Sequence, residues 1–178
     1  MEEKNESNEL INDPNNYWEQ LERLEKLIRA SEIKAGIIFS FHSLVLGLIF
    51  DRFDRFEPIL TSSYIAIILS VLWFISVLIS IFYCFICFKP QIEMKYDKNV
   101  FFFGDAANAF GGIKEYTKKL IDVCTDEKKL FQQLAEQIHV ECVIIDAKFR
   151  SIRKSMNYFG LSIIFFISVM IYWVIKPI

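Results

Sequence analysis

Three long apolar runs, separated by charged segments, set the pattern of this chain. The longest covers residues 59–88 and carries no charged side chain. A helix of about 30 residues is roughly 45 Å long, which exceeds the roughly 30 Å hydrocarbon core of a bilayer. The runs at 35–50 and 158–175 are shorter, and the first falls slightly below the usual length of a span. We predict transmembrane helices in 35–56 (which includes a short outer loop), 59–88 and 157–176.

The segment before the first run has the period of an amphipathic helix. Residues 1–15 are acidic and polar, and we expect a mobile tail there. Residues 16–34 predict an amphipathic helix that continues into the first span. Small and apolar residues recur in it at alternating steps of four and three, as in a heptad seam: Tyr17, Leu21, Leu24, Ile28, Ser31 and Ala35. Between the first two spans, 51–58 is expected to be a short charged loop in which Pro58 starts the next helix.

Residues 89–156 predict a second polar module made mainly of helices. A short apolar strand or buried turn is expected at 100–103, and a helix at 113–124. Thr125 or Asp126 then caps a long helix. With no Gly or Pro between positions 126 and 159, this helix is expected to continue into the last span. Its seam follows the same rhythm with one break near Ile138: Phe131, Leu134, Ile138, Cys142, Ile145, Phe149, Ile152 and Met156.

The pattern therefore predicts an all-α membrane protein, with three transmembrane helices and a small cytoplasmic helical hairpin or bundle that is continuous with the spans. The chain is 53% hydrophobic yet 24% charged, because the charges concentrate outside the apolar runs. Its net charge of −2 argues against a protein that coats a nucleic-acid polymer. Basic residues near the span ends place the amino terminus and 89–156 in the cytoplasm and the carboxyl terminus outside.

The sequence contains no motif of a known catalytic site. It has no Walker loop, no G-x-S-x-G, no H-E-x-x-H and no His/Cys cluster with the spacing of metal ligands. Cys84 and Cys87 form a C-x-x-C, but they lie inside an apolar run, where packing is expected rather than zinc binding. We therefore expect no enzyme activity, no metal and no cofactor.

Polar side chains near the spans and in the second module are the remaining candidates for function. An aromatic face beside a carboxylate suits a nucleotide base, and paired basic residues suit a phosphate. Each group also has a structural interpretation: a membrane boundary, core packing or a solvated helix face. His42 is an ionisable side chain in an apolar run, which makes it a candidate for membrane gating unless it bonds a neighbouring helix. The ligand-binding candidates are Glu32, Lys34, Phe103, Asp105, Tyr116, Gln137, Lys148 and Arg150.

Short motifs recur in a fixed order around the spans: Ser31–Gly36, Lys89–Pro90, Phe102–Asp105, Glu115–Tyr116, Leu134–Ile138 and Ala147–Phe149. In their order and spacing they resemble the Pycsar-type transmembrane effector family. The similarity runs from about Leu21 to the carboxyl end. Glu32 stands where the family pattern usually has Asp, a conservative departure. No ligand residues are carried over from the family.

The resemblance implies an antiphage defence effector of the bacterial inner membrane. In such systems a genetically linked cyclase makes cyclic CMP or cyclic UMP on infection, and the effector senses it and compromises the membrane (abortive infection). The expected partners are this cyclic nucleotide, the lipid bilayer and further copies of the chain, because three spans cannot enclose a sizeable aqueous path. Two alternatives remain open: an effector gated by a cyclic oligonucleotide, as in CBASS-like systems, or a non-catalytic scaffold that binds a partner helix through its heptad seams.

Overall fold

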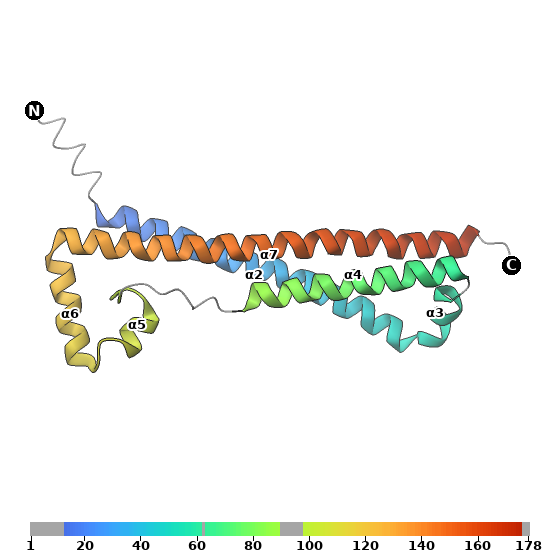
Figure 1. Cartoon of the computed structure of the whole chain (residues 1–178), viewed down its shortest axis with the longest axis horizontal. Coiled ribbons are helices and arrows are strands. Elements are labelled where there is room, and N and C mark those ends of the chain that lie inside the picture. The colour runs from blue at the N-terminus through green and yellow to red at the C-terminus, as the bar shows by residue number, and fades with distance from the viewer. Residues whose placement is uncertain (1–12, 62, 90–97, 176–178) are drawn as a thin grey trace, which may run out of the picture. The chain divides into compact units, whose positions relative to one another are not determined.

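The structure is a computed structural model that describes residues 13–61, 63–89 and 98–175. These parts are helical, without a strand, and the helices follow one another along the chain as Figure 1 shows. They are α2 (Pro14–Asp51), α3 (Phe53–Leu60), α4 (Tyr64–Phe88), α5 (Phe103–Asn108), α6 (Ile113–Thr125) and α7 (Glu127–Ile175). Helices α2, α4 and α7 are each long and apolar enough to cross a membrane. The predicted fold class is confirmed.

The two longest helices begin at side-chain caps. The backbone N–H of Asn15 donates to Asp13 Oδ1 (2.9 Å) at the start of α2. Of the two predicted caps of the long helix, the structure selects Asp126, whose Oδ1 accepts from the N–H of Lys129 (3.2 Å). Thr125 instead donates to the carbonyl of Ile121 inside α6. The tail expected at 1–15 lies outside the described residues, apart from its last three, where α2 begins.

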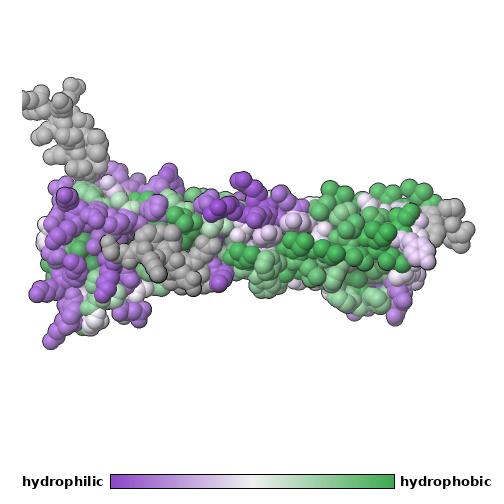
Figure 2. All heavy atoms as spheres, in the orientation of Figure 1, coloured by the Kyte–Doolittle hydropathy of each residue, from purple (hydrophilic) through white to green (hydrophobic). Residues whose placement is uncertain are grey.

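The chain forms two compact units, and α2 and α7 each contribute to both. Among the described residues, the first unit comprises 13–28 and 98–146, and we call it the polar unit. The second comprises 29–61, 63–89 and 147–175, and we call it the span unit. Figure 2 shows hydrophobic residues gathered over the apolar stretches of α4 and α7. Large apolar side chains exposed there match a surface that faces lipid.

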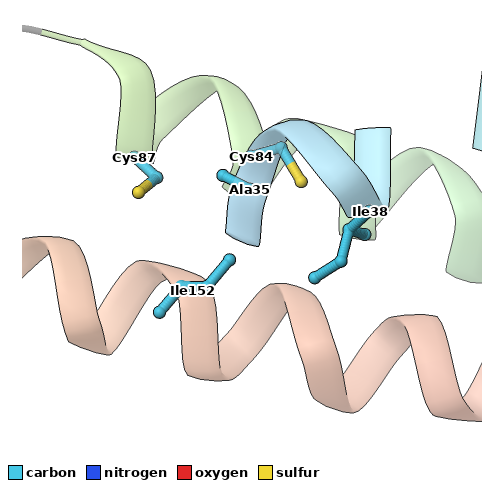
Figure 3. Packing of buried hydrophobic residues seen from close by; sticks show 5 residues of the cluster. All are labelled: Ala35, Ile38, Cys84, Cys87 and Ile152. Atoms are coloured by element: carbon cyan, nitrogen blue, oxygen red, sulfur yellow. The ribbon is translucent and has the colours of Figure 1, made fainter. Parts of the chain in front are cut away.

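Small side chains from three helices meet inside the span unit. Ala35 and Ile38 of α2 point toward Cys84 and Cys87 of α4 and toward Ile152 of α7 (Figure 3). Ala35, Cys84 and Cys87 are fully buried. Small residues let helix backbones approach closely, which is how helices associate in lipid. The two cysteines thus pack in the core, as their place in an apolar run predicted.

The segment between the first two spans differs from the expected loop. Residues 53–60 form helix α3, and Pro58 lies inside it rather than at the start of the next helix. Phe56 packs against a second cluster made by Ile49, Trp73 and Val77. Through this contact the short helix buries part of an apolar side. The sequence does not reveal this side because charged residues dominate the segment.

The second span is shorter than the apolar run that predicted it. Ile59 and Leu60 belong to α3, and α4 starts at Tyr64. Ser63 caps α4 by accepting from the N–H of Ala66 (3.4 Å). Its hydroxyl also donates to Tyr172 Oη (2.8 Å), which ties this end of α4 to α7.

The buried stripe of α7 differs from the predicted seam. Cys142 is exposed, and Met156 is 54% exposed, so the seam is wrong at these two positions. Leu134, Ile145 and Ile152 of the predicted seam are buried. Lys148 and Ser155 are buried beside them, and Glu141, one heptad before Lys148, is half-buried. A search for apolar periodicity passes over such positions because their side chains are polar.

Candidate functional site

A buried lysine joins the three long helices of the span unit. Lys148 of α7 is 4% exposed. Its Nζ donates to Glu32 Oε1 of α2 (2.8 Å) and to the carbonyl oxygen of Cys87 in α4 (2.6 Å). The Cys87 carbonyl is among the last four of its helix, which lack a helical N–H partner. We call this arrangement the lysine junction.

The surroundings of the lysine junction are mostly buried, which makes loss of the ion pair costly. Ser31, which precedes Glu32, is fully buried, and Cys87 Sγ lies 3.8 Å from its carbonyl oxygen. Lys34 lies over the ring of Phe149, with its Nζ 6.0 Å from the ring centroid. A charge in such a place must be paired, because an unpaired buried ammonium costs several kcal/mol, on the order of 3–5. The lysine junction can therefore hold three helices in one arrangement. Loss of the contact of Lys148 with Glu32 or with Cys87 favours a different arrangement of these helices.

A second polar group is buried deeper in the spans. His42 of α2 is 3% exposed, and its ring meets that of Phe159 in α7 edge to face, with centroids 5.2 Å apart. Among the described residues its Nε2 has no hydrogen-bond partner.

In the polar unit, hydrogen bonds fix a turn that begins at Asn99 and carries an aromatic ring. Asn99 donates through its side-chain amide to the carbonyl of Gln133 (2.7 Å) and through its backbone N–H to Asp105 Oδ2 (2.9 Å). Tyr116 Oη donates to the carbonyl of Val100 (3.2 Å), and Val100 is buried. Residues 100–102 thus form a turn, not a strand; Val100 is buried in it, while Phe101 and Phe102 are half-buried and Phe103 begins α5.

The ring that this turn presents is Phe101, which borders a cavity of about 260 Å³. Trp18 of α2 meets it at 90°, with ring centroids 5.4 Å apart. The other lining residues are mostly acidic or amide side chains from α2 and α7: Leu21, Glu22, Glu25, Gln137 and Glu141. The cavity lies within the polar unit.

Glu141 is the least satisfied of these side chains. Its Oε1 accepts from Gln137 Nε2 (3.3 Å), while its Oε2 is buried without a partner among the described residues. Burial raises the pKa of the Glu141 carboxyl; the hydrogen bond from Gln137 opposes this, and the nearby Glu25 charge adds to the rise. At Glu22 the effect is reversed, because a hydrogen bond and ion pair with Lys26 (2.7 Å) lower the pKa of its carboxyl.

The predicted ligand residues fall into both units. Glu32, Lys34, Lys148 and Arg150 belong to the span unit, where the first and third bond each other and Arg150 is exposed.

The other four candidates belong to the polar unit. Gln137 lines the cavity, and Asp105 and Tyr116 fix the turn beside it. Phe103 is 70% exposed and packs against Phe102, with ring centroids 5.0 Å apart.

Phe101 belongs to the aromatic run whose ring faces suit a base, but sequence reasoning missed Trp18 and Glu141 as cavity residues. Trp18 stands beside the first seam, one residue after Tyr17, and it is 46% exposed although it is large and apolar. Glu141 lies three residues after Ile138, where the seam rhythm continues once a polar side chain is allowed. These two signals, an exposed Trp and a carboxylate at an inward position, could have pointed to the cavity.

Comparisons with known proteins agree with the similarity noted in the sequence. A sequence-family model described as the Pycsar effector protein domain matches residues 16–175. The chain is 28% identical over 141 residues to the Pycsar effector protein PtPycTM of Propioniciclava tarda, covering 78% of this chain and 69% of that protein. No solved structure matches the chain.

Proposed function

Because the chain belongs to the Pycsar effector family, we propose that it is an antiphage effector that senses a cyclic pyrimidine nucleotide and compromises the bacterial inner membrane. The signal is cyclic CMP or cyclic UMP, made by a partner cyclase. The chain acts by changing conformation, without catalysis. Its three candidate spans supply the membrane attachment that this function requires.

The observation that carries this proposal is the lysine junction. Lys148 is bonded to α2 and α4 at once, at the polar ends of all three long apolar stretches. Helix α7 runs without a break from Glu127, in the polar unit, to Ile175. In the resting state the junction is intact. A ligand bound in the polar unit can shift the balance between the intact and the broken junction through this one helix.

To open the lysine junction, the ligand must bind more tightly to the state in which the junction is broken, which we call the released state. Moving the population from 1:99 to 99:1 takes about 5.5 kcal/mol of differential binding. Several copies assemble in the membrane, because three helices enclose no sizeable aqueous path. His42, buried with its Nε2 unpartnered among the described residues, is then available to line or gate a path formed when the junction opens. By the positive-inside rule, 89–156 and the amino terminus face the cytoplasm, where the nucleotide is made.

Expression in a bacterial host tests the proposal. With a pyrimidine cyclase induced beside it, the chain is expected to abolish membrane potential and viability within minutes, as read by a potential-sensitive dye and colony counts. The control is a cyclase inactivated at its catalytic carboxylates, with which the cells should remain polarised. Polarised, viable cells with active cyclases for both pyrimidine nucleotides contradict the proposal. A response confined to an oligonucleotide cyclase transfers the function to the cyclic-oligonucleotide alternative.

A further inference from the structure

The cavity of the polar unit has the size and walls of a site for one flat ring. Its volume of about 260 Å³ exceeds the roughly 150 Å³ that accommodates a benzene molecule. It falls short of the 300–1,000 Å³ of sites for drug-sized ligands. Trp18 and Phe101 supply aromatic surface, on which nucleotide bases stack with about 1–3 kcal/mol each.

The polar lining of the cavity is rich in hydrogen-bond acceptors. Glu22, Glu25 and Glu141 offer carboxyl oxygens, and Glu141 Oε2 is buried with no partner among the described residues. Gln137 is already engaged as a donor to Glu141. A ligand that completes this arrangement must bring N–H donors on a flat ring, and it must keep any anionic group away from the carboxylates.

We propose that this cavity reads the base of the signal nucleotide: it takes the pyrimidine ring of a cyclic mononucleotide and selects cytosine over uracil. The inference rests on the proposed function for the ligand class and adds the site and the base. Cytosine presents an exocyclic amino group, for which a carboxylate is the matching acceptor. Uracil presents a carbonyl oxygen at the same position, which would face the carboxylate with like polarity. The cyclic phosphate stays outside, since the acidic lining repels it.

Residues of the cavity lie on a helix that also contributes to the lysine junction, so binding in the cavity can affect the junction. Glu141 and Lys148 are both inward-facing residues of α7, one heptad apart on an unbroken helix. Pairing the Glu141 carboxyl with a base gives its Oε2 a hydrogen-bond donor and changes the packing at one of these positions. Coupling to the lysine junction then needs no additional element.

Binding to the full chain in detergent micelles, measured by calorimetry, tests the inference. We expect cyclic CMP to bind about fivefold to 150-fold more tightly than cyclic UMP, from the roughly 1–3 kcal/mol that one base-edge contact discriminates. Glu141→Gln should reverse or erase this preference, because an amide offers the uracil edge a donor beside an acceptor. Cytidine should compete with cyclic CMP, whereas inorganic phosphate should not.

Two further variants make the outcome decisive. Glu136→Gln is the matched control: Glu136 lies on the same helix, bonds Gln132 and does not line the cavity, so it should leave both affinities unchanged. Glu25→Gln, on α2, replaces the test if Glu141→Gln loses its helical circular dichroism. Wild-type affinity and base preference in both cavity variants would overturn the site while leaving nucleotide sensing intact. Tighter binding of cyclic UMP by the wild type overturns the selection, and binding of neither nucleotide overturns this inference together with the proposed ligand.

Discussion

Glu32→Ala is expected to destabilise the protein by about 2–3 kcal/mol, and Lys148→Met by only about 1 kcal/mol, although both remove the same ion pair. The asymmetry follows from burial. The Lys148 side chain is 5% exposed and that of Glu32 is 41% exposed. Without Glu32, the buried ammonium keeps one partner among the described residues, the Cys87 carbonyl. Without Lys148, Glu32 turns to water, and Met fills the place of the lysine stem.

Thermal unfolding in detergent measures the difference. For a chain of this size, 2–3 kcal/mol corresponds to a fall in Tm of roughly 4–12 °C. The double variant Glu32→Ala/Lys148→Met should be only slightly less stable than Lys148→Met alone, by the small packing contribution of Glu32. The losses of the two single variants are therefore not additive. Lys129→Met, which removes one of the two solvent-exposed partners that Asp122 has in the described part of the chain, is the control and should change Tm little. Equal losses from both single variants contradict a buried junction.

The same variants should alter the membrane. Because the junction ties three helices, Glu32→Ala is expected to depolarise cells in the absence of a cyclase, whereas Lys148→Met/Glu32→Ala should relieve part of this toxicity. Depolarisation is read with the potential-sensitive dye at matched expression, confirmed by immunoblot. A Glu32→Ala protein that is destabilised yet silent without signal would restrict the junction to folding and remove its role in the resting state.

Ser155→Leu is the second large effect that we expect: a loss of about 3 kcal/mol from overpacking and lost hydrogen bonds, or failure of α4 and α7 to pack together. Ser155 is fully buried between α7 and α4. Its hydroxyl donates to the Ser80 carbonyl (3.0 Å), and Ser80 donates to the Ser155 carbonyl at the same distance. Cys84 Sγ lies 3.1 Å from Ser155 Oγ. Three added carbon atoms have no room at such a close crossing.

Detergent-solubilised yield and Tm measure this effect, with Ser43→Leu as the matched control. Ser43 is exposed on α2, and its hydroxyl bonds the Phe39 carbonyl of its own helix (3.0 Å), so leucine there adds only apolar surface. Ser155→Ala separates packing from hydrogen bonding and should cost about 1 kcal/mol. A Ser155→Leu protein as stable as the Ser43→Leu protein would mean that α4 and α7 do not pack closely at this point.

The spans and the unbroken helices could be predicted from the sequence because they depend on local properties. An uncharged run long enough to cross a bilayer, and the absence of Gly or Pro from 126 to 159, decide α4 and α7 almost without tertiary information. The register of the first seam was predictable for the same reason: Leu21, Leu24, Ser31 and Ala35 are all buried.

The second seam and the sites depended on tertiary partners. Lys148 at an inward position is acceptable only because Glu32 and the end of α4 meet it there, from far away in the sequence. Ser155 is inward because a small residue is needed where helices approach closely, and hydropathy gives it no weight. The cavity needs the Asn99 turn to bring Phe101 to Trp18, a placement set by hydrogen bonds to Gln133 and not by periodicity.

The most direct test of the account is ion flux across vesicles that contain only the purified chain and lipid. Potassium-loaded vesicles polarised with valinomycin report any new ion path as loss of a dye signal. We expect the signal to persist with linear CMP and to collapse within seconds to minutes of adding cyclic CMP. Vesicles that stay polarised with saturating cyclic CMP and cyclic UMP, although they contain folded protein, contradict the claim that this chain turns a cyclic pyrimidine nucleotide into membrane damage.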